Sequence, residues 1–174
     1  MLPYNENRIA TAHWKSMHWD AENTYPIFDW LWSSGQLSER DIEQLPSAGF
    51  VHVVNLALPT SSPSLPGEAE LVTRRGLNYF HLPVVWEAPQ RQQLEVFFRL
   101  MLALQNQRTW VHCAKNKRVS VFVYLFRRLQ RGESEQAARP ALGAIWQPDA
   151  VWQRFIDDAL ASPIPTDKIG HASE

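Results

Sequence analysis

Residues 109–129 read TWVHCAKNKRVSVFVYLFRRL, and three segments of different character follow one another within them. Residues 109–112 are mostly apolar and predict a short strand, which delivers Cys113 into a polar turn. Residues 119–129 are apolar nearly all round until an arginine pair, which is typical of a helix buried in the middle of a domain. We expect the domain to be organised around this strand, turn and helix.

The residues on either side continue an alternation of strands and helices. An early strand over 27–32 runs into a turn, and Ser38 is a suitable N-cap for a short helix that Gly49 ends. Further strands are expected over 50–58 and 79–85, and further helices over 68–75, from Pro89 to about Gln107, and in two pieces between Glu133 and Leu160 that separate near Gln147 and Pro148. The alternation predicts an α/β fold with a central, mainly parallel sheet and helices on both faces.

Length and charge exclude several classes of protein. The chain has 174 residues, of which 45% are hydrophobic, which is enough for one compact domain and too few for two large ones. Lys and Arg number 17 against 18 Asp and Glu, so a net charge of -1 gives no global attraction to nucleic acid or to anionic membranes. No apolar run approaches the roughly 18 residues of a membrane span. We therefore expect no nucleic-acid or membrane partner.

The cysteine count and the composition of the termini predict the cellular location and the division of the chain into parts. A single cysteine excludes an internal disulfide and suits a reducing compartment, and the N-terminus lacks the layout of a secretion signal, so we expect a cytoplasmic protein. We expect three parts: an N-terminal extension over 1–26 that packs on or near the domain, the catalytic domain over 27–162, and a C-terminal tail over 163–174.

The polar turn has the chemistry of an anion site. Ligands of open α/β sheets bind at the carboxyl ends of strands, where the backbone N–H groups of such a turn and the following helix N-terminus form an anion cradle. This cradle favours the thiolate of Cys113, and so do the cationic side chains of Arg118, Lys115 and Lys117. Arg118 can hold two phosphate oxygens in a bidentate grip that lysine cannot reproduce. We therefore expect Cys113 to attack phosphorus and form a phosphocysteine intermediate.

The turn resembles the signature of the cysteine-based protein tyrosine and dual-specificity phosphatases, which is His-Cys, five residues, Arg, then Ser or Thr. His112 and Cys113 match it directly, whereas only four residues separate Cys113 from Arg118, and Asn116 stands where the family usually has glycine. The resemblance covers residues 30–160 and includes the segments Ser34-Gly35-Gln36, Ala48-Gly49-Phe50, Val53-Val54-Asn55-Leu56 and His81-Leu82-Pro83-Val84. The chain is similar to the bacterial, atypical dual-specificity branch, which includes the phosphatase-like domain associated with β-lactamase-hydrolase-like proteins. This resemblance implies the compact cysteine-phosphatase fold, with no metal and no other cofactor.

The resemblance also implies roles for the matching positions. They are Cys113 as nucleophile, Arg118 as phosphate clamp, His112 as a support for the turn, and Ser120 as a hydroxyl that assists departure of the thiolate. The remaining residues of the expected substrate-binding turn are Ala114, Lys115, Asn116, Lys117 and Val119. The family usually has an Asp as general acid in the loop after the strand that corresponds to residues 79–85. The only carboxylate there is Glu87, which we expect to be the acid.

Other interpretations remain open. A rhodanese-like sulfurtransferase also has a cysteine, four residues and an arginine in its loop, and it carries a persulfide on the cysteine. A catalytically weak phosphate-binding module would fit the missing Asp and the shortened turn. If the chain is a phosphatase, we expect its partner to be a phosphorylated protein or a small phosphomonoester, and inorganic phosphate or sulfate would also fit the turn. The tryptophans are expected to fill the core or to line the site, with Trp86 next to the expected acid.

Overall fold

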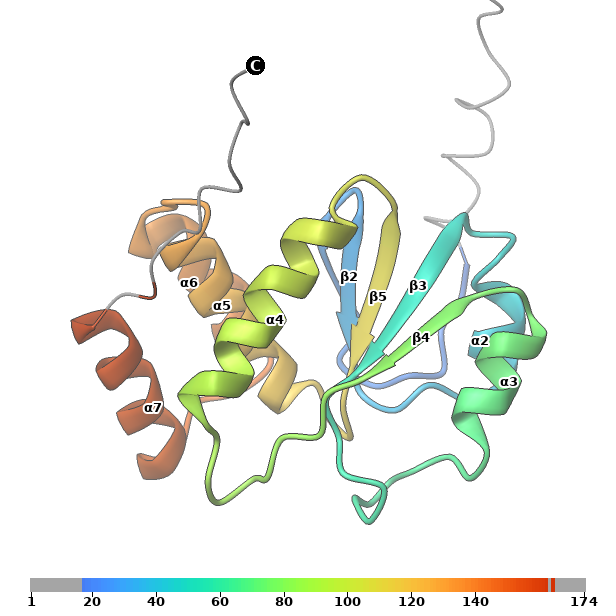
Figure 1. The fold of residues 1–174 in the computed structure, drawn as a ribbon, viewed down its shortest axis with the longest axis horizontal. Helices are drawn as coiled ribbons and strands as arrows, with labels where there is room; N and C mark the ends of the chain where they lie inside the picture. The colour runs from blue at the N-terminus through green and yellow to red at the C-terminus, as the bar shows by residue number, and fades with distance from the viewer. Residues whose placement is uncertain (1–16, 163, 165–174) are drawn as a thin grey trace, which may run out of the picture.

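Five strands form one sheet at the centre of the molecule (Figure 1). The computed structural model describes residues 17–162 and 164. The strands are β1 (Tyr25–Phe28), β2 (Leu31–Ser34), β3 (Phe50–Asn55), β4 (Asn78–His81) and β5 (Arg108–His112), and they lie in the order β1-β2-β5-β3-β4. β1 runs antiparallel to β2, and the other neighbouring pairs are parallel. The expected α/β class with a mainly parallel sheet is confirmed.

Helices cover both faces of this sheet. They are α2 (Glu39–Gln44), α3 (Glu68–Arg74), α4 (Arg91–Leu104), α5 (Lys117–Leu129), α6 (Glu135–Gly143) and α7 (Ala150–Ala161). Figure 1 shows α2 and α3 on one side of the sheet and α4, α5, α6 and α7 on the other. Because side chains alternate along a strand, Val54 and Val111 enter the core under the larger group, whereas Val53 and Trp110 enter the core under α2 and α3.

The helix that follows the cysteine turn lies in the middle of the larger core, as expected. Residues 118–126 of α5 are all buried. Helices α4, α6 and α7 all contact α5. The N-terminus of α5 is therefore held in a fixed position relative to the end of β5, which lies between β2 and β3 in the sheet.

The short helix α2 begins as its sequence predicts. The side chain of Ser38 accepts the N–H of Asp41, and the carboxylate of Asp41 accepts the N–H of Ser38, which forms a capping box. Asp41 is fully buried and also accepts the backbone N–H groups of Asp20, at 2.8 Å, and Ala21, at 3.0 Å. The capping carboxylate thus fastens the residues before the sheet to the domain.

Several boundaries differ from the sequence predictions. The expected single strand over 27–32 is two antiparallel strands, because the chain turns between Phe28 and Leu31, and β1 begins at Tyr25, inside the expected extension. The strand expected over 50–58 ends at Asn55, whose side-chain oxygen accepts the N–H of Ala57 at 2.7 Å and turns the chain.

The end of β4 and the start of α4 also differ from the sequence predictions, and the described range limits what can be compared at the two termini. The strand expected over 79–85 ends at His81, and the next helix begins at Arg91 with Gln90 as its N-cap rather than at Pro89. Residues 1–16 of the expected extension lie outside the described residues, and so does the tail apart from residue 164.

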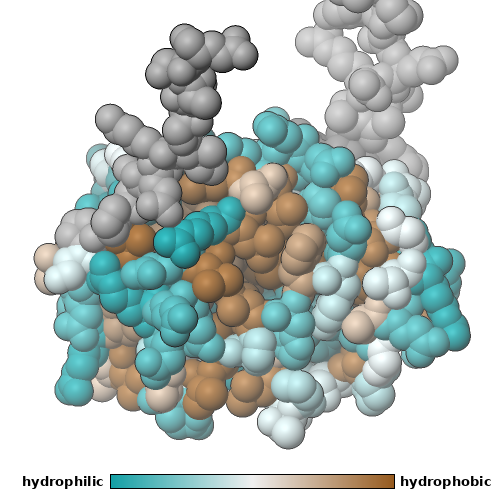
Figure 2. Space-filling model, in the orientation of Figure 1, coloured by the Kyte–Doolittle hydropathy of each residue, from teal (hydrophilic) through white to brown (hydrophobic). Residues whose placement is uncertain are grey.

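The surface carries few large apolar side chains. Figure 2 shows apolar residues among polar ones in the middle of the face that α4 crosses. In the part of the chain that the structure describes, the exposed large hydrophobic residues are Val85, Val96 and Val151, and single exposed residues of this kind are ordinary. Across residues 17–162, every helix is too short or too polar to cross a membrane.

Candidate active site

Cys113 lies where the central strand β5 ends and the chain turns toward α5. Its N–H donates to the carbonyl oxygen of Ser34 on the neighbouring strand β2 at 3.3 Å, and the N–H of Leu56 after β3 donates to the carbonyl of His112 at 2.9 Å. The cysteine is 1% exposed. The strands on both sides of β5 therefore fix the residue at the carboxyl edge of the sheet, which is where ligands of such sheets bind.

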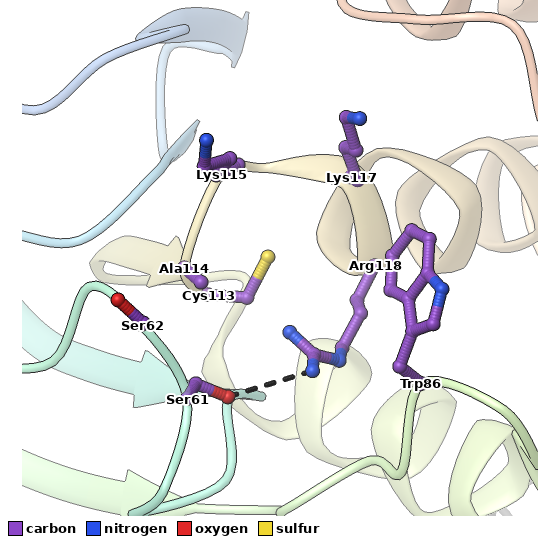
Figure 3. Close-up of a pocket in the computed structure, with 8 residues that line it drawn as sticks. All are labelled: Ser61, Ser62, Trp86, Cys113, Ala114, Lys115, Lys117 and Arg118. Carbon is purple, nitrogen blue, oxygen red and sulfur yellow. Dashed lines mark hydrogen bonds between the residues drawn. The ribbon is translucent and has the colours of Figure 1, made fainter.

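A pocket of about 270 Å³ opens in front of the cysteine (Figure 3). It is lined by Ser61, Ser62, Trp86, Cys113, Ala114, Lys115, Lys117 and Arg118. Three of these residues are cationic and none is a carboxylate. The pocket therefore has the charge of an anion site, and the lining brings together the expected nucleophile and the expected phosphate clamp.

Arg118 is the most buried cation of this pocket. It is 7% exposed, whereas Lys115 is exposed and Lys117 is half-buried. Figure 3 shows its guanidinium between Ser61 and Trp86: Nη2 is 3.5 Å from Ser61 Oγ, and Cζ lies 5.5 Å from the ring centre of Trp86. Its Nε has no hydrogen-bond partner among residues 17–162 and 164. The side chain is thus positioned by its neighbours and keeps donors for a ligand.

Asn116 occupies the position that glycine usually holds, and its backbone explains the exchange. Its φ of 61° lies in the left-handed region, which asparagine tolerates better than most residues. Its side-chain amide donates to the carbonyl of Asn23 at 2.7 Å and to Ser33 Oγ at 3.0 Å. In return, the amide of Asn23 donates to the carbonyl of Lys115 at 3.1 Å. Asn116 therefore shapes the turn and ties it to the segment before β1, and its fully buried side chain does not line the pocket.

Gly35 allows the chain to pass close behind the turn. A Cβ at this position would lie 2.9 Å from the carbonyl oxygen of Ala114 and 3.1 Å from that of Glu22. The N–H of Gly35 donates to Glu22 at 2.8 Å, and the N–H of Gln36 donates to Ala114 at 3.0 Å. The Ser-Gly-Gln segment noted in the sequence thus braces the turn from the neighbouring strand.

Two expected site residues on α5 have side chains that are otherwise engaged. The hydroxyl of Ser120 donates to the carbonyl of Lys117 at 2.9 Å and accepts the indole N–H of Trp146 at 3.1 Å. The side chain of Val119 is fully buried in the core and does not line the pocket. The predicted role of Ser120 in thiolate departure stays a prediction, and Val119 can meet a ligand only through its backbone.

The expected acid, Glu87, is not brought to the cysteine. It is exposed and lines a separate hollow of about 320 Å³ together with residues of α7, including Arg154 and Asp158. Trp86, its neighbour in sequence, enters the Cys113 pocket instead and packs against Trp146, at 5.3 Å between ring centres. In the described structure the pocket wall that follows β4 is therefore aromatic rather than acidic.

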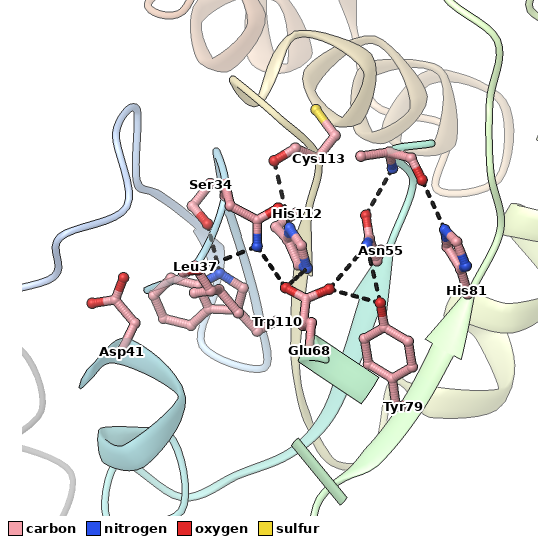
Figure 4. A network of polar contacts seen from close by, with 12 residues as sticks. Ser34, Leu37, Asp41, Asn55, Glu68, Tyr79, His81, Trp110, His112 and Cys113 are labelled. Carbon is pink, nitrogen blue, oxygen red and sulfur yellow. Dashed lines mark hydrogen bonds and ion pairs between the residues drawn. The ribbon is translucent and has the colours of Figure 1, made fainter. Parts of the chain in front are cut away.

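Behind the turn lies a network of buried polar groups centred on Glu68, the first residue of α3 (Figure 4). Its Oε1 is 2.7 Å from the amide of Gln36 and 3.0 Å from His112 Nε2. Its Oε2 is 2.9 Å from the amide of Asn55 and 2.6 Å from the hydroxyl of Tyr79. His112 is fully buried and does not line the pocket, so it supports the turn rather than touching a ligand.

The electrostatics of the network follow from these contacts. Burial raises the pKa of Glu68, but the charge of His112 and hydrogen bonds from His112, Tyr79 and Gln36 outweigh it, so the pKa lies below its ordinary value. Burial and the neighbouring Glu68 carboxylate raise the pKa of Tyr79, which therefore stays a hydroxyl donor. The only local signal for Glu68 is its place after Gly67, where a helix was expected to begin.

Comparisons with known proteins bear on the fold that carries this pocket. No family model matches the sequence, and a search of curated proteins gives no match either. A solved structure of a candidate phosphatase (DUF442) from Shewanella putrefaciens CN-32 is 29% identical, with a TM-score of 0.70 over 83% of this chain and 93% of that one. A second crystal structure with the same description gives a TM-score of 0.72 over 82% and 93% of the two chains.

More distant structures share the fold. P. aeruginosa TpbA, solved as a Cys-to-Ser variant in complex with pTyr, is 17% identical, with a TM-score of 0.62 over 83% of this chain and 89% of that one. The core catalytic domain of the PP-IP phosphatase SIW14 from S. cerevisiae, in complex with citrate, is also 17% identical, with a TM-score of 0.65 over 79% and 85%. The expected compact cysteine-phosphatase fold is confirmed.

Proposed function

We propose that this chain, a structural match to the cysteine-based, protein-tyrosine-phosphatase-like family, hydrolyses phosphomonoesters through a phosphocysteine intermediate on Cys113. The observation that carries the proposal is the pocket at the end of β5, which holds the cysteine, the buried Arg118 and two lysines, with no carboxylate in its lining. A phosphate dianion matches this charge, and the first-turn N–H groups of α5 add further donors.

In the first step the Cys113 thiolate attacks phosphorus. An S–P bond forms while the bond from phosphorus to the ester oxygen breaks, and the electron pair leaves with that oxygen, which takes a proton from water. Arg118 binds two of the three remaining oxygens, and the backbone N–H groups of the turn stabilise the charge on them. The partial positive charge of the α5 N-terminus favours the thiolate before the attack.

In the second step water attacks the phosphocysteine. A new O–P bond forms, the S–P bond breaks, and its electron pair returns to sulfur. The products are inorganic phosphate and the regenerated thiolate, and the proton of the water is released. The same donors stabilise both transition states, because the charge develops on the same oxygens each time.

The lining of the pocket makes aryl phosphates the favoured substrates. With Glu87 outside the pocket, no side-chain acid of the lining can protonate the leaving oxygen. A phenol has a pKa of about 10 and leaves as its anion more easily than an alkyl alcohol. Phosphotyrosine, the ligand in the TpbA complex, is such a substrate, and the half-buried side chain of Trp86 in the pocket lining provides a surface for its ring. Because the nucleophile is a free thiol, the reducing cytoplasm is the expected setting.

The test is steady-state hydrolysis of para-nitrophenyl phosphate from pH 5 to 8, with wild type and Cys113→Ser. We expect turnover that is blocked by vanadate, unaffected by a chelator, and reduced by three or more orders of magnitude in the variant, because serine is a far weaker nucleophile. Phosphate binding by the variant shows that the pocket is intact. Turnover that survives Cys113→Ser would exclude the phosphocysteine.

Two alternatives give different results in the same preparation. The four residues between Cys113 and Arg118 favour a sulfurtransferase, which would move sulfur from thiosulfate to cyanide without cleaving aryl phosphates. The absence of a carboxylate from the pocket lining favours a phosphate-binding module, which would bind phosphotyrosine peptides without turnover. Either result in the wild-type protein replaces the phosphatase proposal.

A further inference from the structure

Ser61 lies in the wall of the Cys113 pocket, on the loop that follows β3. Its backbone N–H donates to the carbonyl oxygen of Leu58 at 2.9 Å, and its Oγ accepts the N–H of Leu58 at 3.1 Å. These two reciprocal bonds close residues 58–61 into a turn and fix the direction of the serine side chain. The hydroxyl is therefore held in place before a ligand arrives.

The start of this loop is fixed by two strands of the sheet. The N–H of Ala57 donates to the side-chain oxygen of Asn55, the last residue of β3, at 2.7 Å. The carbonyl oxygen of Ala57 accepts from Nε2 of His81, the last residue of β4, also at 2.7 Å. The position of Ser61 is thus set by the same edge of the sheet that holds Cys113.

Both neighbours of the Ser61 oxygen are hydrogen-bond donors. They are the N–H of Leu58 and Nη2 of Arg118, which is 3.5 Å away. A hydroxyl has two lone pairs and one proton, so with both lone pairs facing donors only the proton is left to make a bond. Among residues 17–162 and 164, no acceptor takes that proton. The hydroxyl is therefore a donor available to the occupant of the pocket.

The spacing of Ser61 and Arg118 suits a single oxygen bound by both. Figure 3 shows the serine oxygen facing the guanidinium. Because Oγ and Nη2 are 3.5 Å apart, an oxygen can lie about 2.8 Å from each of them, which is an ordinary distance for charge-assisted bonds. Arg118 Nε, in a side chain that is 7% exposed, has no hydrogen-bond partner in the described part of the chain. The pair therefore fits an anion with several oxygens.

The length of the cysteine turn gives a reason for a donor from another loop. Four residues separate Cys113 from Arg118, where the phosphatase signature has five. A turn with one residue fewer has one backbone N–H fewer to offer to an anion. The hydroxyl of Ser61 supplies a donor that does not belong to the turn.

We propose that Ser61 is a substrate-binding residue, whose hydroxyl donates to the phosphate oxygen that Arg118 Nη2 also binds. The inference rests on the proposed function, because it names a further ligand of the phosphate held in that site. Since its lone pairs already face donors, Ser61 donates and does not accept. It therefore favours an oxygen without a proton, as in the phosphate dianion.

The test is the affinity for inorganic phosphate, measured in the Cys113→Ser protein so that turnover does not intervene. Phosphate is titrated and followed by the backbone amide signals of the NMR spectrum. We expect Ser61→Ala to raise the Kd by about tenfold, because it removes a hydrogen bond to a charged group. Ser61→Thr keeps the hydroxyl and should bind within about twofold of the parent protein. Ser64→Ala is the matched control, because Ser64 is exposed on the same loop and does not line the pocket, and it should leave the Kd unchanged.

A double variant separates direct binding from the positioning of Arg118. If Ser61 acted only by holding the guanidinium, Ser61→Ala would have no further effect after Arg118→Lys has removed that group. We expect a further loss of about threefold or more, because the hydroxyl touches the phosphate itself.

Three results would overturn the proposal: no phosphate binding by the Cys113→Ser protein, an equal Kd in Ser61→Ala, or no further loss in the double variant. Phosphate binding needs no turnover. A failure of the phosphocysteine mechanism would therefore appear separately, as a lack of hydrolysis by the wild-type protein.

Discussion

The two sides of the cysteine turn differ in how many of their polar groups already have hydrogen-bond partners within the protein. Behind the turn, three side chains donate hydrogen bonds to Glu68, and the side-chain amides of Asn23 and Asn116 each donate to a backbone carbonyl. In front of it, Arg118 makes one long hydrogen bond to Ser61 within the described residues, and its Nε has no partner. A back rich in internal hydrogen bonds fixes the geometry of the turn, and Arg118 at the front keeps a donor for an anion, which is the arrangement that preorganised catalysis requires.

The largest effect is expected at the front of the turn. Arg118→Lys keeps the charge but loses the bidentate grip, so kcat/KM for para-nitrophenyl phosphate should fall by about a hundredfold or more while the melting temperature hardly changes. Arg154→Lys, on the exposed surface of α7, is the control and should keep wild-type activity. A loss of less than threefold in Arg118→Lys would show that the guanidinium is not the clamp.

The next largest effect is expected at Glu68, behind the cysteine turn, where the stability of the fold should fall as the pH becomes acidic. Folding lowers the pKa of Glu68 from 4.5, so its contribution to stability is complete above the unfolded value and is lost as the pH falls through the lower folded value. Between pH 6 and 3, the melting temperature of wild type should therefore fall more steeply than that of Glu68→Gln. Glu70→Gln, an exposed residue of the same helix, should retain the wild-type slope. Parallel curves for wild type and Glu68→Gln would contradict the buried, ionised carboxylate.

A smaller effect should separate backbone from side chain at Asn116. Asn116→Gly and Asn116→Ala both lose the amide bonds, but only alanine is strained at a φ of 61°. The alanine variant should be less stable to urea by about 1 kcal/mol, after allowance for the greater freedom of unfolded glycine. At Gln130, where φ is -104°, alanine should be at least as stable as glycine. The same order at both positions would rule out strain as the reason for asparagine.

The smallest effect is expected at the rim of the front. Lys115→Ala and Lys117→Ala should each raise KM by about two- to threefold, because Lys115 is exposed and Lys117 is half-buried, and charges that remain in contact with water contribute little. The effect should shrink at high salt, since screening weakens the interaction between such charges and the substrate. Measurement at low and high ionic strength checks this, and a tenfold rise that persists in high salt would place a lysine among the direct phosphate ligands.

Local sequence was enough to predict the frame of the site. The strand before Cys113, the buried helix after it and the Ser38 cap depend on residues close together in the chain, and the structure has all three. Asn55 turns the chain through a bond to a residue only two positions away, yet it shortened the expected strand. Boundaries were less accurate because a strand ends where such side-chain bonds replace the ladder.

The back of the site could not be predicted, because its contacts join distant residues. Asn23 and Asn116 are 93 residues apart, and neither periodicity nor spacing relates them. Glu87 was chosen because it is the carboxylate nearest in sequence to the expected position, whereas the fold turns Trp86 into the pocket and Glu87 away from it. Which of two neighbours faces a cavity depends here on the packing of Trp86 against Trp146 and Trp152, which a single sequence does not reveal.

The contacts made by residues 17–24 move the working boundary of the catalytic unit. Trp19 packs on Trp110 at 4.5 Å between ring centres, and Asn23 holds the carbonyl of Lys115. A protein trimmed to begin at residue 27 would lose both contacts and half of β1. The segment expected to be an N-terminal extension thus supports the cysteine turn. Its loss would loosen the turn before it unfolded the sheet.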